Sequence, residues 1–396
     1  MDMDGMDWAS RGRKAWMGGA VRPEVAFVSG QGAWLTDSDR TEYLDFVSGW
    51  AVCALGHAAP EIAAALEDQS RRLVHCSPGF WNPVAIELAE RLKSLTGMDR
   101  VFLGTTGAEA NECAIKLARK WGARHRAGAY RVVSTWKGFH GRTLATMSAT
   151  GKPEWHGLFG PACEGFTHVE YGDLSALDGA LGPEVCAVLL EPVQGEGGVV
   201  AASPGYLQAV RELCDRHGVL LIADEVQTGL GRCGAWLACD ALGVRPDIVT
   251  LGKGLGGGVP VSACATRAEL DLFEPGDQGG TFTYHPLGAA VALAVLRAIE
   301  ERDLLRASRE RGEQVGRILS DLAIRHGLRD VRGMGLLRAF DLPQAQAADL
   351  VAVARERGLL LNAPKPSTIR ICPALTVSES EVEEFGRRLE AALDAL

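Results

Sequence analysis

The sequence lacks three features that mark large classes of protein: long apolar runs, signal-like N-terminal hydrophobicity and blocks of basic residues. No run of about eighteen apolar residues occurs, so no transmembrane helix is expected. The N-terminal string MDMDGMDWASRGRKAW has no unbroken apolar stretch, which argues against a signal peptide. The chain has 41 Lys and Arg residues against 50 Asp and Glu residues, and no run of Lys and Arg is longer than two residues. We therefore expect a cytoplasmic protein with neither a nucleic-acid nor a membrane partner.

Two further motifs are missing. The ten cysteines are scattered and include no CxxC pair, so neither a metal site nor a disulfide framework is expected. The phosphate-binding string GxxxxGK[ST] is also absent, which excludes a nucleotide hydrolase of the P-loop type.

What is present is typical of a large α/β protein. Of the 396 residues, 47% are hydrophobic, which is enough to bury an extensive core. Short apolar runs alternate with amphipathic segments such as 108–121 and 204–217. This alternation predicts a mostly parallel sheet covered by helices on both faces. The expected strands are 101–103, 131–134, 187–190, 219–223, 247–251 and 261–265.

The pattern divides the chain into three parts. Residues 46–286 are expected to form the large α/β domain. After it, 287–396 form a smaller α+β domain that begins with a long helical segment, 287 to about 325, and ends with a helix near 379–396. Residues 1–45 are expected to form a small antiparallel sheet that packs with this C-terminal domain.

Four polar clusters follow expected strands, where parallel sheets bind ligands. The string GTTGAEANE (104–112) can bind an anion through backbone N–H groups, or can be a tight strand–helix turn. Asp224 must be paired, whether it serves a ligand or caps a helix. Lys253, among glycines, can act as a nucleophilic amine or can be a solvated surface residue. Glu191 and Glu196 can recognise cations or form structural salt bridges.

The pattern GxGxxG occurs at 229–234 and at 252–257, which raises the alternative of a dinucleotide site. The second match is followed by VPVSACAT, which is typical of a strand and not of the helix that the motif requires. The first match has no acidic residue near position 254. A nicotinamide-dependent enzyme is therefore disfavoured.

Taken together, the motifs resemble the class III pyridoxal-phosphate (PLP) aminotransferases, and most closely their acetylornithine and succinylornithine branch. The resemblance spans nearly the whole chain in the family's order, with the strings GTTGAEANECAIKLAR, FHGRT, EPVQGEGG, IADEVQTGLGRCG, LGKGLGGGVP and IRICPALTVSE. It implies the PLP-dependent transferase fold (fold type I), the cofactor pyridoxal 5'-phosphate and a homodimer in which both subunits line each active site.

The resemblance assigns cofactor roles residue by residue. Lys253 matches the Schiff-base lysine that also moves the proton. Asp224 matches the acid that pairs with the pyridinium nitrogen. The other matched cofactor contacts comprise two phosphate-binding backbone N–H groups, two residues on the faces of the ring, one partner of the phenolic oxygen and one hydroxyl from the second subunit: Gly107, Ala108, Phe139, Val226, Gln227 and Thr281 of the partner subunit.

Substrate recognition falls to three matched residues. Arg142 would bind the carboxylate remote from the reacting amine. Glu196 matches a switch residue that masks Arg370 while an ω-amine donor is bound and moves aside for 2-oxoglutarate. The implied reaction moves the terminal amine of N-acetylornithine, or a similar acyl-amino acid, to 2-oxoglutarate by a ping-pong mechanism.

Two stretches depart from the family pattern. QGGTFTYHPLG (278–288) has Gln278, Tyr284 and His285 near the expected phosphate site and dimer interface, and SPGFWN (77–82) has Pro78 and Trp81 near the substrate entrance. These departures leave open other donors, namely 4-aminobutyrate, ornithine or another ω-amino acid. Further alternatives are an epimerase or decarboxylase of the same fold, and a PLP-fold protein that only binds a partner.

Overall fold

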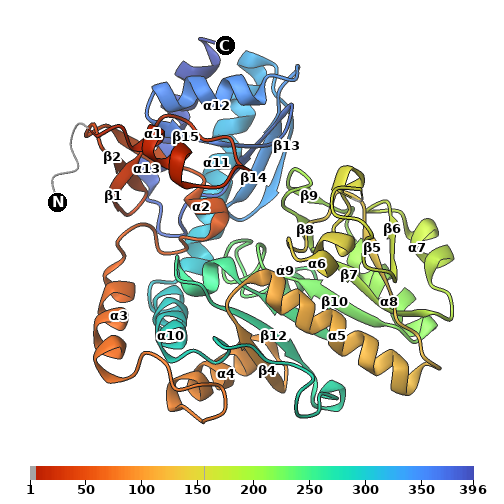
Figure 1. Ribbon diagram of the computed structural model, residues 1–396. Helices are drawn as coiled ribbons and strands as arrows, with labels where there is room; N and C mark the ends of the chain where they lie inside the picture. Colours follow the sequence, from red (N-terminus) through yellow and green to blue (C-terminus); the bar gives the residue numbers. More distant parts are fainter. Residues whose placement is uncertain (1–5, 156) are drawn as a thin grey trace.

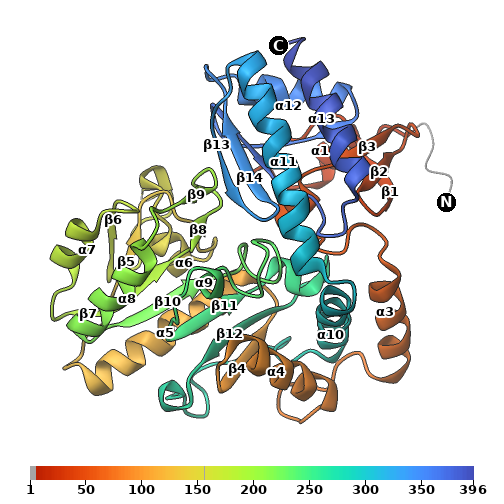
Figure 2. The same cartoon turned by 180° about the vertical axis from the view of Figure 1, so that it is seen from behind.

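The computed structural model describes residues 6–155 and 157–396. A seven-stranded sheet lies in one part of the molecule, and two four-stranded sheets lie together in another (Figures 1 and 2). The long helix α11 (Leu304–His326) runs from one part towards the other. In the described chain, no helix is long and apolar enough to span a bilayer.

The large sheet is mostly parallel, as the alternating pattern predicts. Its strand order is β4-β12-β11-β10-β7-β5-β6, and only β12 runs antiparallel to its neighbours. Six of these strands overlap the expected runs, and β6 was not expected. The strands, in spatial order, are Arg100–Gly104, Ser262–Thr266, Ile248–Leu251, Leu220–Asp224, Val185–Leu190, Arg131–Thr135 and Phe166–Val169.

Helices cover both faces of this sheet because successive side chains of a strand point to opposite faces. On β10, Leu220 and Ile222 pack in the cluster that contains α5 (Gly107–His125). Leu221, between them, packs in the cluster that contains α8 (Tyr206–His217). Burial on both faces explains why the central strands consist mostly of apolar residues.

The expected helical segment 287–325 is two helices, α10 (Pro286–Glu301) and α11 (Leu304–His326). The break lies at Asp303, whose φ of 47° is left-handed and cannot continue a helix. The helix α10 packs on α3 (Pro60–Arg72) and α4 (Pro83–Thr96). The helix α11 packs instead on α13 (Glu379–Leu393), β13 (Arg329–Met334) and β14 (Leu337–Asp341). The division into 1–45, 46–286 and 287–396 stays a proposal, and this packing favours moving its last boundary to Asp303.

The first and last parts of the chain share a sheet. Strands β1 (Phe27–Gln31), β2 (Trp34–Asp37) and β3 (Glu42–Asp45) are antiparallel, and β15 (Leu359–Leu360) adds in parallel to β3. A second, antiparallel sheet has the order β13-β14-β17-β16. Its strands are Arg329–Met334, Leu337–Asp341, Thr368–Ile371 and Asn362–Lys365, beside α12 (Ala347–Glu356) and α13 (Glu379–Leu393).

The remaining elements are short. They are α1 (Trp8–Ala15), α2 (Ser48–Ala51), α6 (Leu144–Ala149), η1 (Pro153–Trp155), α7 (Leu174–Ala180), β8 (Val193–Gln194), β9 (Val200–Ala201), α9 (Ala238–Ala241), η2 (Lys253–Gly256) and η3 (Ala268–Leu270).

One ion pair makes stability depend on pH. His57 Nε2 lies 2.8 Å from Asp45 Oδ2, and hydrogen bonds to Asp45 and Cys53 raise the pKa of His57 to about 9. The folded state therefore keeps a proton between about pH 6.5 and 9 that the unfolded chain loses, so this stabilisation is complete below pH 6.5 and disappears as pH rises through 9. We expect the free energy of unfolding to fall by about 2 kcal/mol between pH 6 and pH 9 in urea titrations.

The matched variants are His57→Gln and His217→Gln. His57→Gln should remove most of this slope. His217→Gln, which breaks a surface pair with Asp178, should keep it. Parallel pH profiles for the protein and His57→Gln would contradict the assignment.

Candidate active site

The four polar clusters meet at the carboxyl edge of the large sheet. Glu191 follows β7, Asp224 ends β10 and Lys253 follows β11. Gly107 begins α5 directly beyond β4. The common direction of these strands brings together clusters that lie far apart in the sequence.

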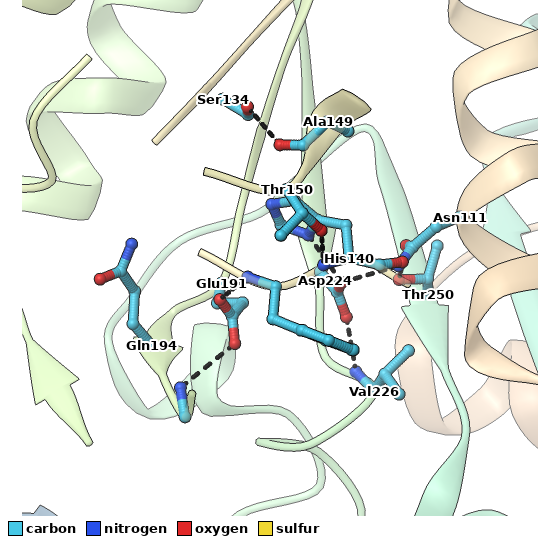
Figure 3. Close-up of polar contacts among 12 residues, drawn as sticks. Asn111, Ser134, His140, Ala149, Thr150, Glu191, Gln194, Asp224, Val226 and Thr250 are labelled. Atoms are coloured by element: carbon cyan, nitrogen blue, oxygen red, sulfur yellow. Dashed lines mark hydrogen bonds and ion pairs between the residues drawn. The ribbon is translucent and has the colours of Figure 1, made fainter. Parts of the chain in front are cut away.

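Asp224 is a buried carboxylate that accepts hydrogen bonds from three groups (Figure 3). Its side chain accepts from Asn111 Nδ2 at 2.8 Å, His140 Nδ1 at 2.9 Å and the Val226 backbone N–H at 3.0 Å. Burial acts to raise the pKa of Asp224, but the hydrogen bond and charge of His140 outweigh it and hold the pKa below its ordinary value. The fold therefore keeps a negative charge at this position.

His140 and Asn111 are site residues that the sequence reasoning missed. The His140 backbone N–H donates to Thr150 Oγ1 at 2.9 Å, while Asn111 accepts from Thr250 Oγ1 at 2.8 Å (Figure 3). Because the ionised Asp224 can only accept, Nδ1 of His140 carries the proton. The string FHGRT contained the signal, since its histidine lies between Phe139 and Arg142, which were both singled out.

Lys253 lies at the start of η2 in a strained, left-handed conformation, with φ at 42°. Burial and the positive charge of Arg370 lower the pKa of its amine, while Asp224, Glu191 and Glu196 oppose that shift. A lowered pKa increases the fraction of neutral amine, the form that attacks a carbonyl carbon and accepts a proton. Of the two interpretations left open for Lys253, the structure favours the reactive one.

Glu191 organises the loop 191–198. Its carboxylate accepts hydrogen bonds from the backbone N–H groups of Phe139 at 3.0 Å and Gly195 at 3.2 Å. Glu191 therefore binds backbone groups, whereas the sequence suggested that it recognises a cation or forms a salt bridge. Burial raises the pKa of Glu191 to about 7, and the nearby Asp224 adds to this rise. A Cβ at Gly195 would lie 1.7 Å from Gln227 Oε1, so any larger residue there would displace the Gln227 side chain.

The start of α5 forms a cradle of closely spaced backbone. Gly107 and Ala108 are its first residues, so their N–H groups have no partner within the helix. A Cβ on Gly107 would lie 2.7 Å from Val226 Cγ1, and one on Gly252 would lie 3.2 Å from the same atom. The side chain of Val226 therefore packs between the two glycine-containing loops. A helix N-terminus with free N–H groups is a suitable site for a phosphate.

Arg370 comes from the other part of the molecule. It lies on β17, its side chain is only 1% exposed, and its Nη1 lies 2.8 Å from Glu196 Oε1. Its guanidinium also donates to Asn362 at 2.8 Å and to Gln227 at 3.4 Å. Burial acts to raise the pKa of Glu196, but the charge and the hydrogen bond of Arg370 outweigh this effect and hold the pKa below its ordinary value.

An aromatic surface supports Arg142. The exposed Arg142 guanidinium lies 4.7 Å from the centre of the Trp155 ring and 5.9 Å from that of Phe139. The two rings meet edge to face with centroids 6.0 Å apart. Trp155 was not singled out from the sequence, because no motif includes it.

Thr281 belongs to an exposed loop, and its carbonyl oxygen accepts from His75 Nε2 at 2.7 Å. The residues that depart from the family pattern lie around this loop. Gln278 accepts from Lys116, Tyr284 accepts through its carbonyl from Asn82, and His285 Nδ1 caps α10. Pro78 and Trp81 are exposed, Trp81 to 92%.

The fold and this site define a class of protein, and comparison with known proteins agrees. The model of the aminotransferase class-III family matches residues 18–393, so the chain belongs to that family. The chain is a PLP-dependent aminotransferase of fold type I. The observed residues fit this cofactor: a buried anion, an amine with a lowered pKa and a Cβ-free cradle at a helix N-terminus.

Among curated proteins, acetylornithine aminotransferase 2 of Bordetella bronchiseptica is 48% identical over 379 residues, which cover 95% of this chain and 96% of that protein. Acetylornithine aminotransferase of Ralstonia nicotianae is 45% identical over 381 residues, with 94% and 96% covered.

Among solved structures, ornithine aminotransferase of Toxoplasma gondii superposes with a TM-score of 0.94 at 35% identity, covering 98% of this chain and 94% of that one. Acetylornithine aminotransferase of Elizabethkingia anophelis gives a TM-score of 0.88 at 31% identity, with 98% of both chains covered. A further structure of the Toxoplasma enzyme is described as having PLP at partial occupancy in its active site.

Proposed function

We propose that this aminotransferase transfers the terminal amine of N-acetylornithine, or of a similar acyl-amino acid, to 2-oxoglutarate by a ping-pong mechanism. The observation that carries the proposal is the ion pair between Glu196 and the buried Arg370. A buried arginine covered by a carboxylate that is itself 27% exposed can be uncovered for one substrate and masked for another. Relatives named acetylornithine aminotransferase, at 40–48% identity, support this donor.

The described residues offer a place for each part of the cofactor. Lys253 would bind its aldehyde carbon and Asp224 its ring nitrogen. Bound PLP supplies an electron sink for the negative charge that develops on the reacting carbon. The backbone N–H groups of Gly107 and Ala108 would bind its phosphate, together with the hydroxyl of Thr281 of the partner subunit. Val226 and Phe139 would pack on the two faces of its ring, and Gln227 would hydrogen-bond its phenolic oxygen.

The protein's own groups divide the work of the reaction. The amine of Lys253 would accept the proton from the substrate carbon and return it, a role that its lowered pKa supports. Arg142 would hold the remote carboxylate of either substrate, with its guanidinium kept in place on Trp155. Glu196 would mask Arg370 for the donor and release it for the α-carboxylate of 2-oxoglutarate.

A second candidate function is transfer from ornithine, 4-aminobutyrate or another ω-amino acid. The TM-score of 0.94 to an ornithine aminotransferase favours it. The acylated donor is favoured by sequence, because the relatives with that name reach 48% identity, against 35% for the ornithine enzyme. An epimerase or decarboxylase of the same fold has no comparable support.

We also propose a homodimer in the cytoplasm. Large apolar side chains are exposed on the Thr281 loop, with Phe282 at 58%, and on segment 77–82, with Phe80 at 72% and Trp81 at 92%. The two segments are in contact, because Asn82 donates to the carbonyl of Tyr284. Neighbouring exposed aromatics of this size mark an interface, and a second subunit that covers them would carry Thr281 to the other active site. The free cysteines support a reducing compartment.

The test is an absorbance titration of the purified holoenzyme. N-acetylornithine should abolish the near-visible band of the lysine-bound cofactor, and 2-oxoglutarate should restore it. Ornithine and 4-aminobutyrate, at matched concentrations, should act at least about tenfold more slowly, since they lack the acyl group. A band that ignores N-acetylornithine and responds to either of the others would assign the second candidate function.

A further inference from the structure

Glu196 lies between two cations that belong to different parts of the fold. Its Oε1 is 2.8 Å from Arg370 Nη1, and its Oε2 is 3.8 Å from Lys152 Nζ. Arg370 is on the small antiparallel sheet, while Lys152 follows α6 beside the large sheet. The positive charges of Arg370 and then Lys152 lower the pKa of Glu196 against its burial.

The second cation is held by its surroundings. Lys152 Nζ lies 4.8 Å above the Trp155 ring and 5.5 Å from the centre of the Phe139 ring. Its backbone N–H donates to Thr150 at 2.9 Å, and its side chain is only 22% exposed. The ammonium group is therefore retained near the carboxylate by cation–π attraction on one side. No motif of the sequence analysis included it.

We propose that Lys152 is a positioning residue that receives the Glu196 carboxylate when Arg370 is uncovered for the acceptor. The proposal rests on the proposed function, in which Glu196 must leave Arg370 before 2-oxoglutarate binds. Separating the partly buried Glu196 carboxylate from Arg370 costs free energy, and a second cation at 3.8 Å reduces that cost. Lys152 thereby favours the open form of the switch.

This role has a one-sided consequence. In the donor-bound form Glu196 stays on Arg370, so removing Lys152 leaves the donor half-reaction unchanged. In the acceptor-bound form Glu196 has left Arg370, and Lys152 is its other ion-pair partner among the described residues. Without Lys152, the form in which Glu196 masks Arg370 is favoured, and the acceptor binds about tenfold more weakly. If Lys152 instead bound the remote carboxylate together with Arg142, both substrates would lose affinity equally.

The test compares Lys152→Met with Lys152→Arg and with Lys137→Met as holoenzymes. Lys137 is a nearby lysine that faces Glu170, so its loss is a matched change of charge. The readouts are the KM and kcat of each half-reaction and the calorimetric Kd of glutarate, an unreactive dicarboxylate. Lys152→Met should weaken glutarate binding and raise the KM for 2-oxoglutarate, each about tenfold, with donor kinetics unchanged. Lys152→Arg should restore both, and Lys137→Met should change neither.

A double-mutant cycle separates this inference from the function on which it rests. Glu196→Gln should tighten glutarate binding and slow the donor half-reaction; no change in either would reject the switch itself. On the Glu196→Gln background, Lys152→Met should have no further effect, because Lys152 acts only through Glu196. The positioning role would be overturned if Lys152→Met still weakened glutarate binding tenfold on the Glu196→Gln background. It would also be overturned if Lys152→Met alone raised the KM values of donor and acceptor equally, or changed neither.

Discussion

Replacing Lys253 by alanine is expected to lower kcat by at least about 10⁴-fold, because in the proposed function this one side chain would provide both the bond to the cofactor and the proton transfer. Its amine is confined at the carboxyl edge of the sheet, where burial and Arg370 lower its pKa. An alanine supplies neither function, and no described lysine replaces it, since Lys152 is held on the Trp155 and Phe139 rings.

Two measurements check this prediction. Steady-state kinetics give kcat, and borohydride reduction followed by peptide mass spectrometry shows whether the cofactor is covalently attached at position 253. The matched control is Lys365→Ala, because burial also lowers the pKa of that lysine, which lies on β16. Lys253→Ala with near-normal turnover would remove Lys253 from both roles, whereas Lys365→Ala should keep full activity.

The central strands could be predicted because burial on both faces leaves only apolar residues. On β7 and β10 every residue is buried, and each strand is a continuous apolar run except for Asp224 at the end of β10. The strand β6 was missed since only one of its four residues, Val169, is fully buried and His168 interrupts the run. The break at Asp303 was missed because neither Gly nor Pro marks it, and the charged residues 300–303 are also typical of an exposed helical turn.

The site could be predicted where chemistry follows a strand and not where contacts join distant segments. Asp224 and Lys253 stand out because a charged residue directly after a buried strand needs a partner. The partners themselves could not be foreseen: His140 meets Asp224 across 84 residues, and Lys152 meets Glu196 through the packing of the loop after α6. Such pairs depend on strand order, which local sequence does not encode.

The second large effect is expected for Asp224→Asn, with kcat lowered by about 10³-fold, or roughly 4 kcal/mol. The carboxylate is 3% exposed and accepts from His140, Asn111 and the Val226 N–H, so both of its oxygens act as acceptors. The amide that replaces the carboxylate has only one acceptor oxygen, so its NH₂ group must face one of these hydrogen-bond donors and that bond is lost. The substitution also removes the charge that would keep the cofactor's ring nitrogen protonated.

The effect of charge can be separated from that of buried hydrogen bonding. His140→Gln leaves Asp224 charged but removes the ring that donates to it, so its kcat loss measures the contribution of that donor alone, and we expect at most about 10²-fold. Asp178→Asn breaks an aspartate–histidine pair of the same kind at the surface, where Asp178 is 48% exposed, and should leave kcat unchanged. Because Asp224→Asn adds the loss of charge to the disturbed network, it must cost more than His140→Gln. Equal kcat values for the two variants would show that Asp224 acts through the hydrogen-bond network and not through its charge.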